Sequence, residues 1–240
     1  MRKVLITLVV LAVLLIAADF GARAVAESKT ADAVQSELGL TTVPDVSIEG
    51  FPFLLHAVQG QYPQVVITAG NIDNGLLPGM RAVANLNQVA LPLQDAINAN
   101  ADNLTAGSTS VQLLVPLTSL QAAIGNNVTL SAAPDGGLAV STTVPVAGQQ
   151  IPLTGVATVT VANDTLTLGV GSLSAAGVNL TPLITAAADA LAGGLTKSFP
   201  LTGVPFTVTE AAVTVSGSDV VLTADTGAVA LADLESAGQR

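Results

Sequence analysis

The chain has 240 residues, of which half are hydrophobic and only 10% are charged, with a formal net charge of −10 and no cysteine. Such a chain is not disordered, because disorder goes with low hydrophobicity and high net charge. The acidic balance argues against nucleic acid as a partner, since phosphate binding needs clustered Lys and Arg. The lack of cysteine excludes disulfides, thiolate nucleophiles and zinc–thiolate sites. Two explanations fit the apolar excess equally well: a buried apolar cavity, or the ordinary composition of an envelope protein.

The N-terminus has the pattern of an export signal. Met1–Lys3 is positively charged, and Val4–Ala18 is an apolar run of about 15 residues, closer to a signal-peptide core than to a full membrane span. Asp19 ends the run, and Ala24–Ala26 offers a small-x-small cleavage site. The alternative is an uncleaved anchor, lengthened by residues 20–22. Either way we expect the rest of the chain to lie outside the cytoplasm.

The length of the remaining chain suits one large domain or two small coupled ones. We predict a signal peptide or N-terminal membrane anchor over residues 1–26. A single α+β domain is then predicted over residues 27–231, followed by a flexible tail at 232–240.

The first half of the chain alternates strands with short helices. A helix is predicted at Ala22–Leu38, because apolar residues recur at helical spacing and Gly39 can end it. Pro92 and Pro116 each follow a strand pattern and precede a short amphipathic helix. A further short helical turn is predicted at Leu54–Val58. Period-two alternation predicts the strands, at residues 46–51, 65–69, 81–91 and 111–115.

The second half is mostly strand, with one long helix. Residues 128–173 alternate apolar and polar positions, with turn signals at 134–137 and 162–164. A helix is predicted at Asn179–Leu195, and a closing hairpin over 206–231. This is an α+β pattern, which we expect to form a strongly curved antiparallel sheet that wraps the long helix in its concave face.

Catalysis is hard to build from these residues. His56 is the only histidine, and no Gly-x-Ser-x-Gly elbow is present. The aspartates lie mostly in turn or cap positions, without the Asp-x-Asp-x-Asp spacing of a calcium loop. We therefore predict no catalytic residue, no metal and no cofactor, and a protein that is not an enzyme.

Two aromatic elements carry a family resemblance. One is Gly50-Phe51-Pro52-Phe53-Leu54, followed by Gly60, Tyr62 and the strand from Val65; the other is Phe199-Pro200-Leu201 with Val204-Pro205-Phe206. In both, the chain resembles the LmeA-type phospholipid-binding envelope proteins of actinobacteria. The resemblance implies phospholipid binding and a role in maintaining mannan or lipoglycan of the cell envelope. It also implies a fold similar to tubular lipid-binding proteins, in which a curved sheet wraps a helix over an apolar groove.

The site residues follow from this resemblance. An apolar helix stripe is ordinarily core packing, but the resemblance favours a lipid groove. The candidate lipid-binding residues are the apolar ones of the two aromatic elements and of the helix stripe: Phe51, Phe53, Leu54, Leu55, Leu183, Ile184, Ala187, Leu191, Phe199 and Phe206. The candidates for headgroup contact are the basic residues Arg81 and Lys197.

The function expected from the sequence is non-enzymatic binding, or transport, of phospholipid in the periplasmic space of the cell envelope. Phospholipid and the membrane surface are the expected partners. A buried methylene contributes about 0.8 kcal/mol, so an acyl chain of ~16 carbons could gain on the order of 10 kcal/mol in an apolar groove. The alternative is a structural or accessory partner of envelope glycan-assembly enzymes that carries no lipid.

Overall fold

The structure is a computed structural model of the whole chain. It describes the following residues: 2–98, 100, 103–125, 127–133, 137–146, 149–171, 173–175, 182–201, 211–226 and 229–230. The predicted tail at 232–240 and residue Phe206 therefore lie outside the described residues.

The chain forms two compact units. Unit 1 comprises residues 1–69, 83–111 and 225–240, and unit 2 comprises residues 70–82 and 112–224. The single domain over residues 27–231 stays a prediction.

Unit 1 begins with α1 (Arg2–Leu38), one uninterrupted helix of 37 residues. The helix predicted from Ala22 is confirmed, and its end before Gly39 as well, where the backbone turns to φ +60°. Its start is far earlier than predicted, because the apolar run of residues 4–18 belongs to the same helix. From Ile6, α1 is long and apolar enough to cross a membrane, a test that a signal sequence also passes.

Short helices interrupt the strands of the first sheet, as the proline positions predict. After β1 (Asp45–Glu49) come α2 (Phe53–Gln59), β2 (Gln61–Ile72), β3 (Met80–Ala90), α3 (Leu93–Ile97) and β4 (Thr105–Pro116). β1 pairs antiparallel with β2, with Ile48 opposite Val65. The first sheet has the order β1-β2-β3-β4-β12-β11 among the described strands, with β13 (Val229–Ala230) beside β4.

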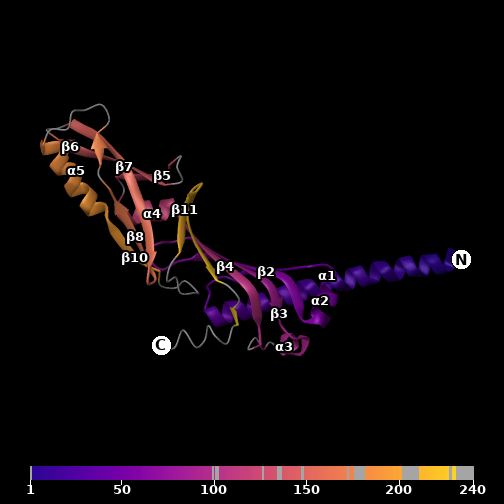
Figure 1. The fold of residues 1–240 in the computed structure, drawn as a ribbon. Coiled ribbons are helices and arrows are strands. Elements are labelled where there is room, and N and C mark those ends of the chain that lie inside the picture. Colours follow the sequence, from indigo (N-terminus) through magenta and orange to yellow (C-terminus); the bar gives the residue numbers. More distant parts are fainter. Residues whose placement is uncertain are drawn as a thin grey trace. The chain divides into compact units, whose positions relative to one another are not determined.

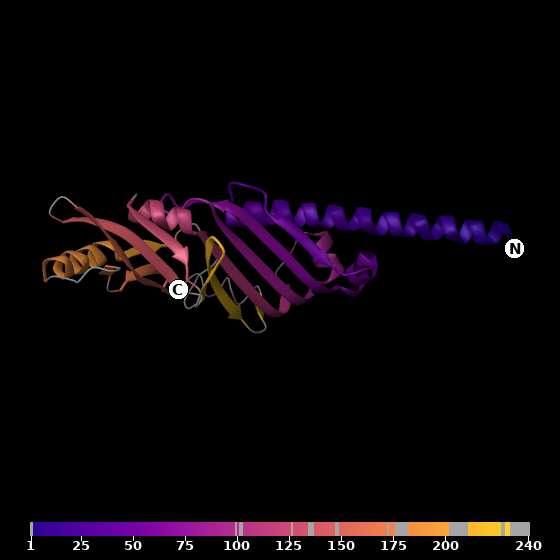
Figure 2. The same ribbon diagram turned by 90° about the horizontal axis from the view of Figure 1, so that it is seen from above.

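The core of unit 1 lies between α1 and the sheet. The second half of α1 runs along β1 (Figure 2). Ala31 of the helix is buried together with residues of the sheet and of α2: Val46, Ile48, Phe53, Ala57, Tyr62, Val89 and Ala106. Ala22 and Ala26 are partly buried against the same cluster.

Unit 2 is built on a second antiparallel sheet. Its strands β5 (Val128–Ala132), β6 (Leu138–Val146), β7 (Gln149–Ala162), β8 (Thr165–Val170) and β10 (Lys197–Pro200) have the spatial order β10-β8-β7-β6-β5, with β9 (Ser174–Ala175) beside β7. The predicted turn between β7 and β8 is confirmed: Asn163 and Asp164 have φ of 49° and 55°, as a two-residue hairpin turn requires. The unit also contains α4 (Leu117–Ile124) and the hairpin of β11 (Ala212–Ser216) with β12 (Asp219–Thr226).

The two faces of the second sheet differ in chemistry. Directly opposed residues of adjacent strands share a face, so the register assigns every strand residue. One face carries buried apolar side chains: Leu130, Leu138, Val140, Leu153, Ala157, Val161, Leu166, Leu168 and Phe199. The other face carries Thr and Ser along β5, β6, β7 and β8. This is the alternation of an antiparallel sheet with one face on the core.

The helix α5 (Pro182–Leu195) packs against β8 and β6 (Figure 1). It buries Ala188, Ala192 and Leu195, which recur at helical spacing. The predicted long helix is therefore confirmed, except for residues 179–181, which lie outside the described residues. The α+β class with antiparallel sheets is also confirmed, and the strong curvature that would wrap the sheet around this helix stays a prediction.

Candidate functional site

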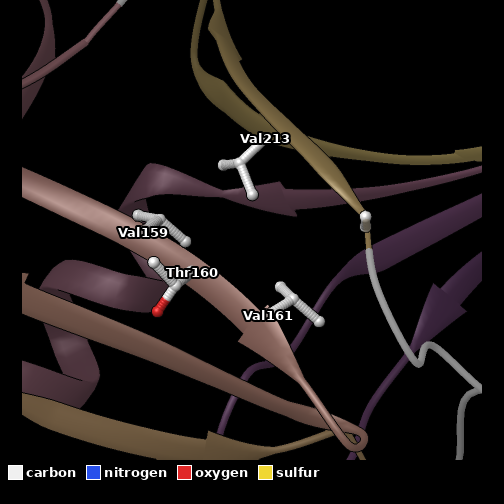
Figure 3. A pocket seen from close by; sticks show the side chains of 5 residues that line it. Val159, Thr160, Val161 and Val213 are labelled. Atoms are coloured by element: carbon white, nitrogen blue, oxygen red, sulfur yellow. The ribbon is translucent and has the colours of Figure 1, made fainter.

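An open trough lies in unit 2, on the apolar face of the second sheet. Its volume is about 440 Å³, and it is lined by Val159, Thr160 and Val161 of β7 with Ala211 and Val213. Val213 on β11 points toward the strand that carries Val159 and Val161, whereas the side chain of Thr160 points the other way (Figure 3). The volume is within the range of small-molecule sites, about 300–1,000 Å³. The trough therefore has the volume of a small-molecule site, and its lining is a mixture of polar and apolar surface that includes three valines.

Two sequence candidates lie in register with the trough. Lys197 is opposite Leu168, which is opposite Val159. Phe199 is opposite Leu166, which in turn is opposite Val161, and all three are buried. Since adjacent strands lie about 4.8 Å apart, each candidate is two strands from a valine of the trough and on the same face. Lys197 is exposed, and so it places a cation at the edge of this apolar face.

The remaining candidates of unit 2 are less favourably placed. Leu191 in α5 is half-buried. Arg81 on β3 lies 3.4 Å from the carboxylate of Asp219, so its charge already has a partner. The side chains of Leu183, Ile184 and Ala187 in α5 lie outside the described part of the chain.

The candidates of the first aromatic element all lie in unit 1, and they divide into two groups. Phe53 is buried in the core, with its ring centroid 6.2 Å from that of Tyr62. Phe51, Leu54 and Leu55 are exposed, at 63%, 40% and 52%. Phe53 thus acts in core packing, and the other three form part of an apolar surface rather than of the trough.

A residue that the sequence analysis did not select holds this element in place. Asp19 of α1 is buried, and its carboxylate accepts hydrogen bonds from the backbone N–H groups of Phe53 (2.9 Å) and Leu54 (2.7 Å). Pro52 precedes α2 and its side chain cannot cap the helix. Asp19 therefore supplies the N-terminal cap of α2 from 34 residues away. In the sequence, the only sign of this role was the position of Asp19 at the end of an apolar run.

His56 has a structural contact. Its Nδ1 lies 3.1 Å from the carbonyl oxygen of Gln61. A carbonyl only accepts, so Nδ1 carries the proton in this hydrogen bond. Among the described residues no group of three or more His, Asp or Glu side chains could hold a metal ion.

The fold and the trough define a class: an α+β protein of antiparallel sheets with an open trough that is lined in part by valines. A sequence model of the LmeA-like phospholipid-binding family matches residues 17–225. The chain therefore belongs to the LmeA-like phospholipid-binding family. No curated protein and no solved structure matches it.

Proposed function

We propose that the protein binds phospholipid without catalysing a reaction, with an acyl chain in the trough of unit 2. The observation that carries this proposal is the trough itself, a volume of about 440 Å³ with Val159, Val161 and Val213 in its lining, in a chain of a phospholipid-binding family. Each buried methylene adds about 0.8 kcal/mol. Affinity would thus come from the hydrocarbon, and polar contacts would select the headgroup.

Lys197 is the proposed headgroup contact. An ammonium group binds phosphate as a point charge, and Lys197 is exposed on the same face as the trough, in register with Val159. Arg81 is the weaker candidate, because binding a phosphate would compete with its ion pair to Asp219. The apolar N-terminal helix supports export to the cell envelope as the setting.

The test places a large side chain in the trough. Val159→Phe adds a ring on the trough side of β7, and Val156→Phe adds the same ring on the opposite face, where Val156 is 56% exposed. Native mass spectrometry after incubation with phosphatidylglycerol vesicles reports the lipid bound. We expect bound lipid in the wild type and in Val156→Phe, and at least a tenfold loss in Val159→Phe.

Equal lipid binding by the two variants would remove the trough as the site. No added lipid mass on the wild type would instead favour the accessory role without cargo.

The same assay on Lys197→Gln separates the headgroup contact from the tail contact, because this variant should lose preference for anionic over zwitterionic lipid while still binding both.

A further inference from the structure

We propose that the N-terminal helix stays on the chain as an anchor, and that an apolar patch beside it docks unit 1 into the bilayer surface. The patch consists of Phe20 on α1 with Phe51, Leu54, Leu55 and Val58 at α2, and is called the α2 patch below. All five side chains are exposed, from 40% for Leu54 to 72% for Val58.

The anchor and the domain are one continuous element. α1 runs from Arg2 to Leu38 without interruption, so the predicted cleavage site at 24–26 lies inside a helix rather than in an exposed loop. Ala22, which precedes that site, and Ala26, which is its last residue, are partly buried against the core of unit 1. Cleavage after Ala26 would therefore remove part of the fold.

Polar contacts support the same conclusion. Asp19 caps α2, and Arg23 lies 2.8 Å from Glu27 and 3.2 Å from the hydroxyl of Ser47. Glu27 in turn accepts a hydrogen bond from the backbone N–H of Ile48. Cleavage after residue 26 would leave Glu27 in place and remove its partner Arg23. The family match begins at residue 17, so it includes Asp19 and Arg23.

The position of the α2 patch follows from α1. The rings of Phe20 and Phe51 lie 6.1 Å apart, which places α2 at the last turn of the apolar run. Leu54, Leu55 and Val58 share one side of α2, and the buried Phe53 and Ala57 share the other. The exposed side of α2 thus extends the apolar surface of α1 sideways at the level where the helix leaves the membrane.

The length of the apolar run explains why a patch is needed there. The apolar run from Val4 together with Asp19 and Phe20 spans about 25 Å at 1.5 Å per residue, which is shorter than the hydrocarbon core of a bilayer, about 30 Å. A short span is accommodated by local thinning of the bilayer, which would bring the apolar groups beside the helix to the level of the acyl chains. The cluster of Arg23, Glu27 and Glu49 begins one turn later and marks the water side. Arg2 and Lys3 would then lie on the cytoplasmic side.

The experiment uses the full chain, reconstituted into vesicles of phosphatidylethanolamine and phosphatidylglycerol. Because the chain has no cysteine, Val58→Cys and Val43→Cys each accept a single polarity-sensitive fluorophore. Val43 is the matched control: it is an exposed valine of unit 1, beyond the far end of α1. We expect lipids with spin-labelled acyl chains to quench the label at position 58 several-fold more strongly than the label at position 43.

Intact mass of the protein purified from the membrane is the second readout, and we expect residues 1–26 to be present. Equal quenching at the two positions would overturn the docking of the α2 patch, and a chain that begins at Glu27 would overturn the anchor. Neither measurement involves the trough of unit 2, so either result is independent of whether that trough holds a lipid.

Discussion

Asp19 shows how much can depend on one side chain. A carboxylate is ordinarily expensive to bury, and it is tolerated here because two backbone donors satisfy it. The same two bonds connect α1 to α2, so a single residue joins the N-terminal helix to the Phe-Pro-Phe element.

Asp19→Ala should therefore destabilise unit 1 by about 1–3 kcal/mol, the cost of leaving buried donors without a partner. Asp32→Ala is the matched control, because Asp32 lies on the same helix and is exposed, where changes are ordinarily within about 0.5 kcal/mol. Amide hydrogen exchange at Phe53 and Leu54 would report the effect directly. Similar exchange rates in the two variants would contradict the capping role.

Tyr62 gives unit 1 a dependence on alkaline pH. Burial raises the pKa of Tyr62 above its ordinary value of 10. The neutral phenol is therefore favoured in the folded state, and its contribution to stability is complete below pH 10 and is lost as the pH rises toward the folded pKa.

As the chain has one tyrosine and no tryptophan, absorbance of the phenolate reports Tyr62 alone. We expect the native protein to titrate above pH 10 and the denatured protein near it. Between neutral pH and pH 11, the Tyr62→Phe variant should lose less stability than the wild type. An identical titration in both states would show that burial has no effect.

At the scale of elements, the turn chemistry of the sequence predicted most of the structure. Pro92 and Pro116 start α3 and α4, and Gly39 follows the last residue of α1. Strand lengths were less accurate, because pairing extends a strand beyond its local signal: residues 65–69 are predicted, and β2 covers Gln61–Ile72. The long start of α1 was missed for a similar reason, since a signal segment and a helix of the fold have the same apolar pattern.

The trough was not predicted, although each of its residues is visible in the sequence. Val and Thr alternate along β7, and the alternation alone does not say which valines meet another strand. Only the pairing of the strands shows that Lys197 and Phe199 lie in line, across the sheet, with Val159 and Val161. The assignment of all apolar candidates to one groove also depends on long-range placement, which local patterns do not contain.

Substitution of Gly60 tests how closely the end of α2 packs against the backbone at Leu91. Its φ is +66°, and an added Cβ would lie 2.9 Å from the carbonyl oxygen of Leu91. Gly39 has a similar φ of +60° with nothing within 4 Å of an added Cβ. Both Gly→Ala variants should lose about 1–2 kcal/mol from the left-handed backbone.

Gly60→Ala should lose more than Gly39→Ala, because the backbone around Leu91 must also move. Thermal unfolding of the two variants in the same detergent would measure the difference. Equal melting temperatures would show that the close approach to Leu91 is relieved without cost.

For the whole molecule, truncation separates a targeting segment from a part of the fold. A chain that starts at residue 18 keeps Asp19, Phe20 and Arg23, and a chain that starts at Glu27 loses all three together with Ala22 and Ala26. We expect hydrogen exchange of unit 1 to be protected in the first chain and several-fold faster in the second. Unit 2 should exchange alike in both chains and serves as the internal control. Equal protection of unit 1 would show that residues 18–26 only direct export.

An uninterrupted α1 also limits what the protein can do with a lipid. Many tethered proteins move on a flexible linker, and their reach grows with the length of that linker. In the arrangement that we propose, the helix that enters the membrane is the same helix that packs on β1, and it contains no linker between the two. With such an anchor, unit 1 could not diffuse away from the bilayer, and lipid would have to be delivered to the protein or taken up where it stands.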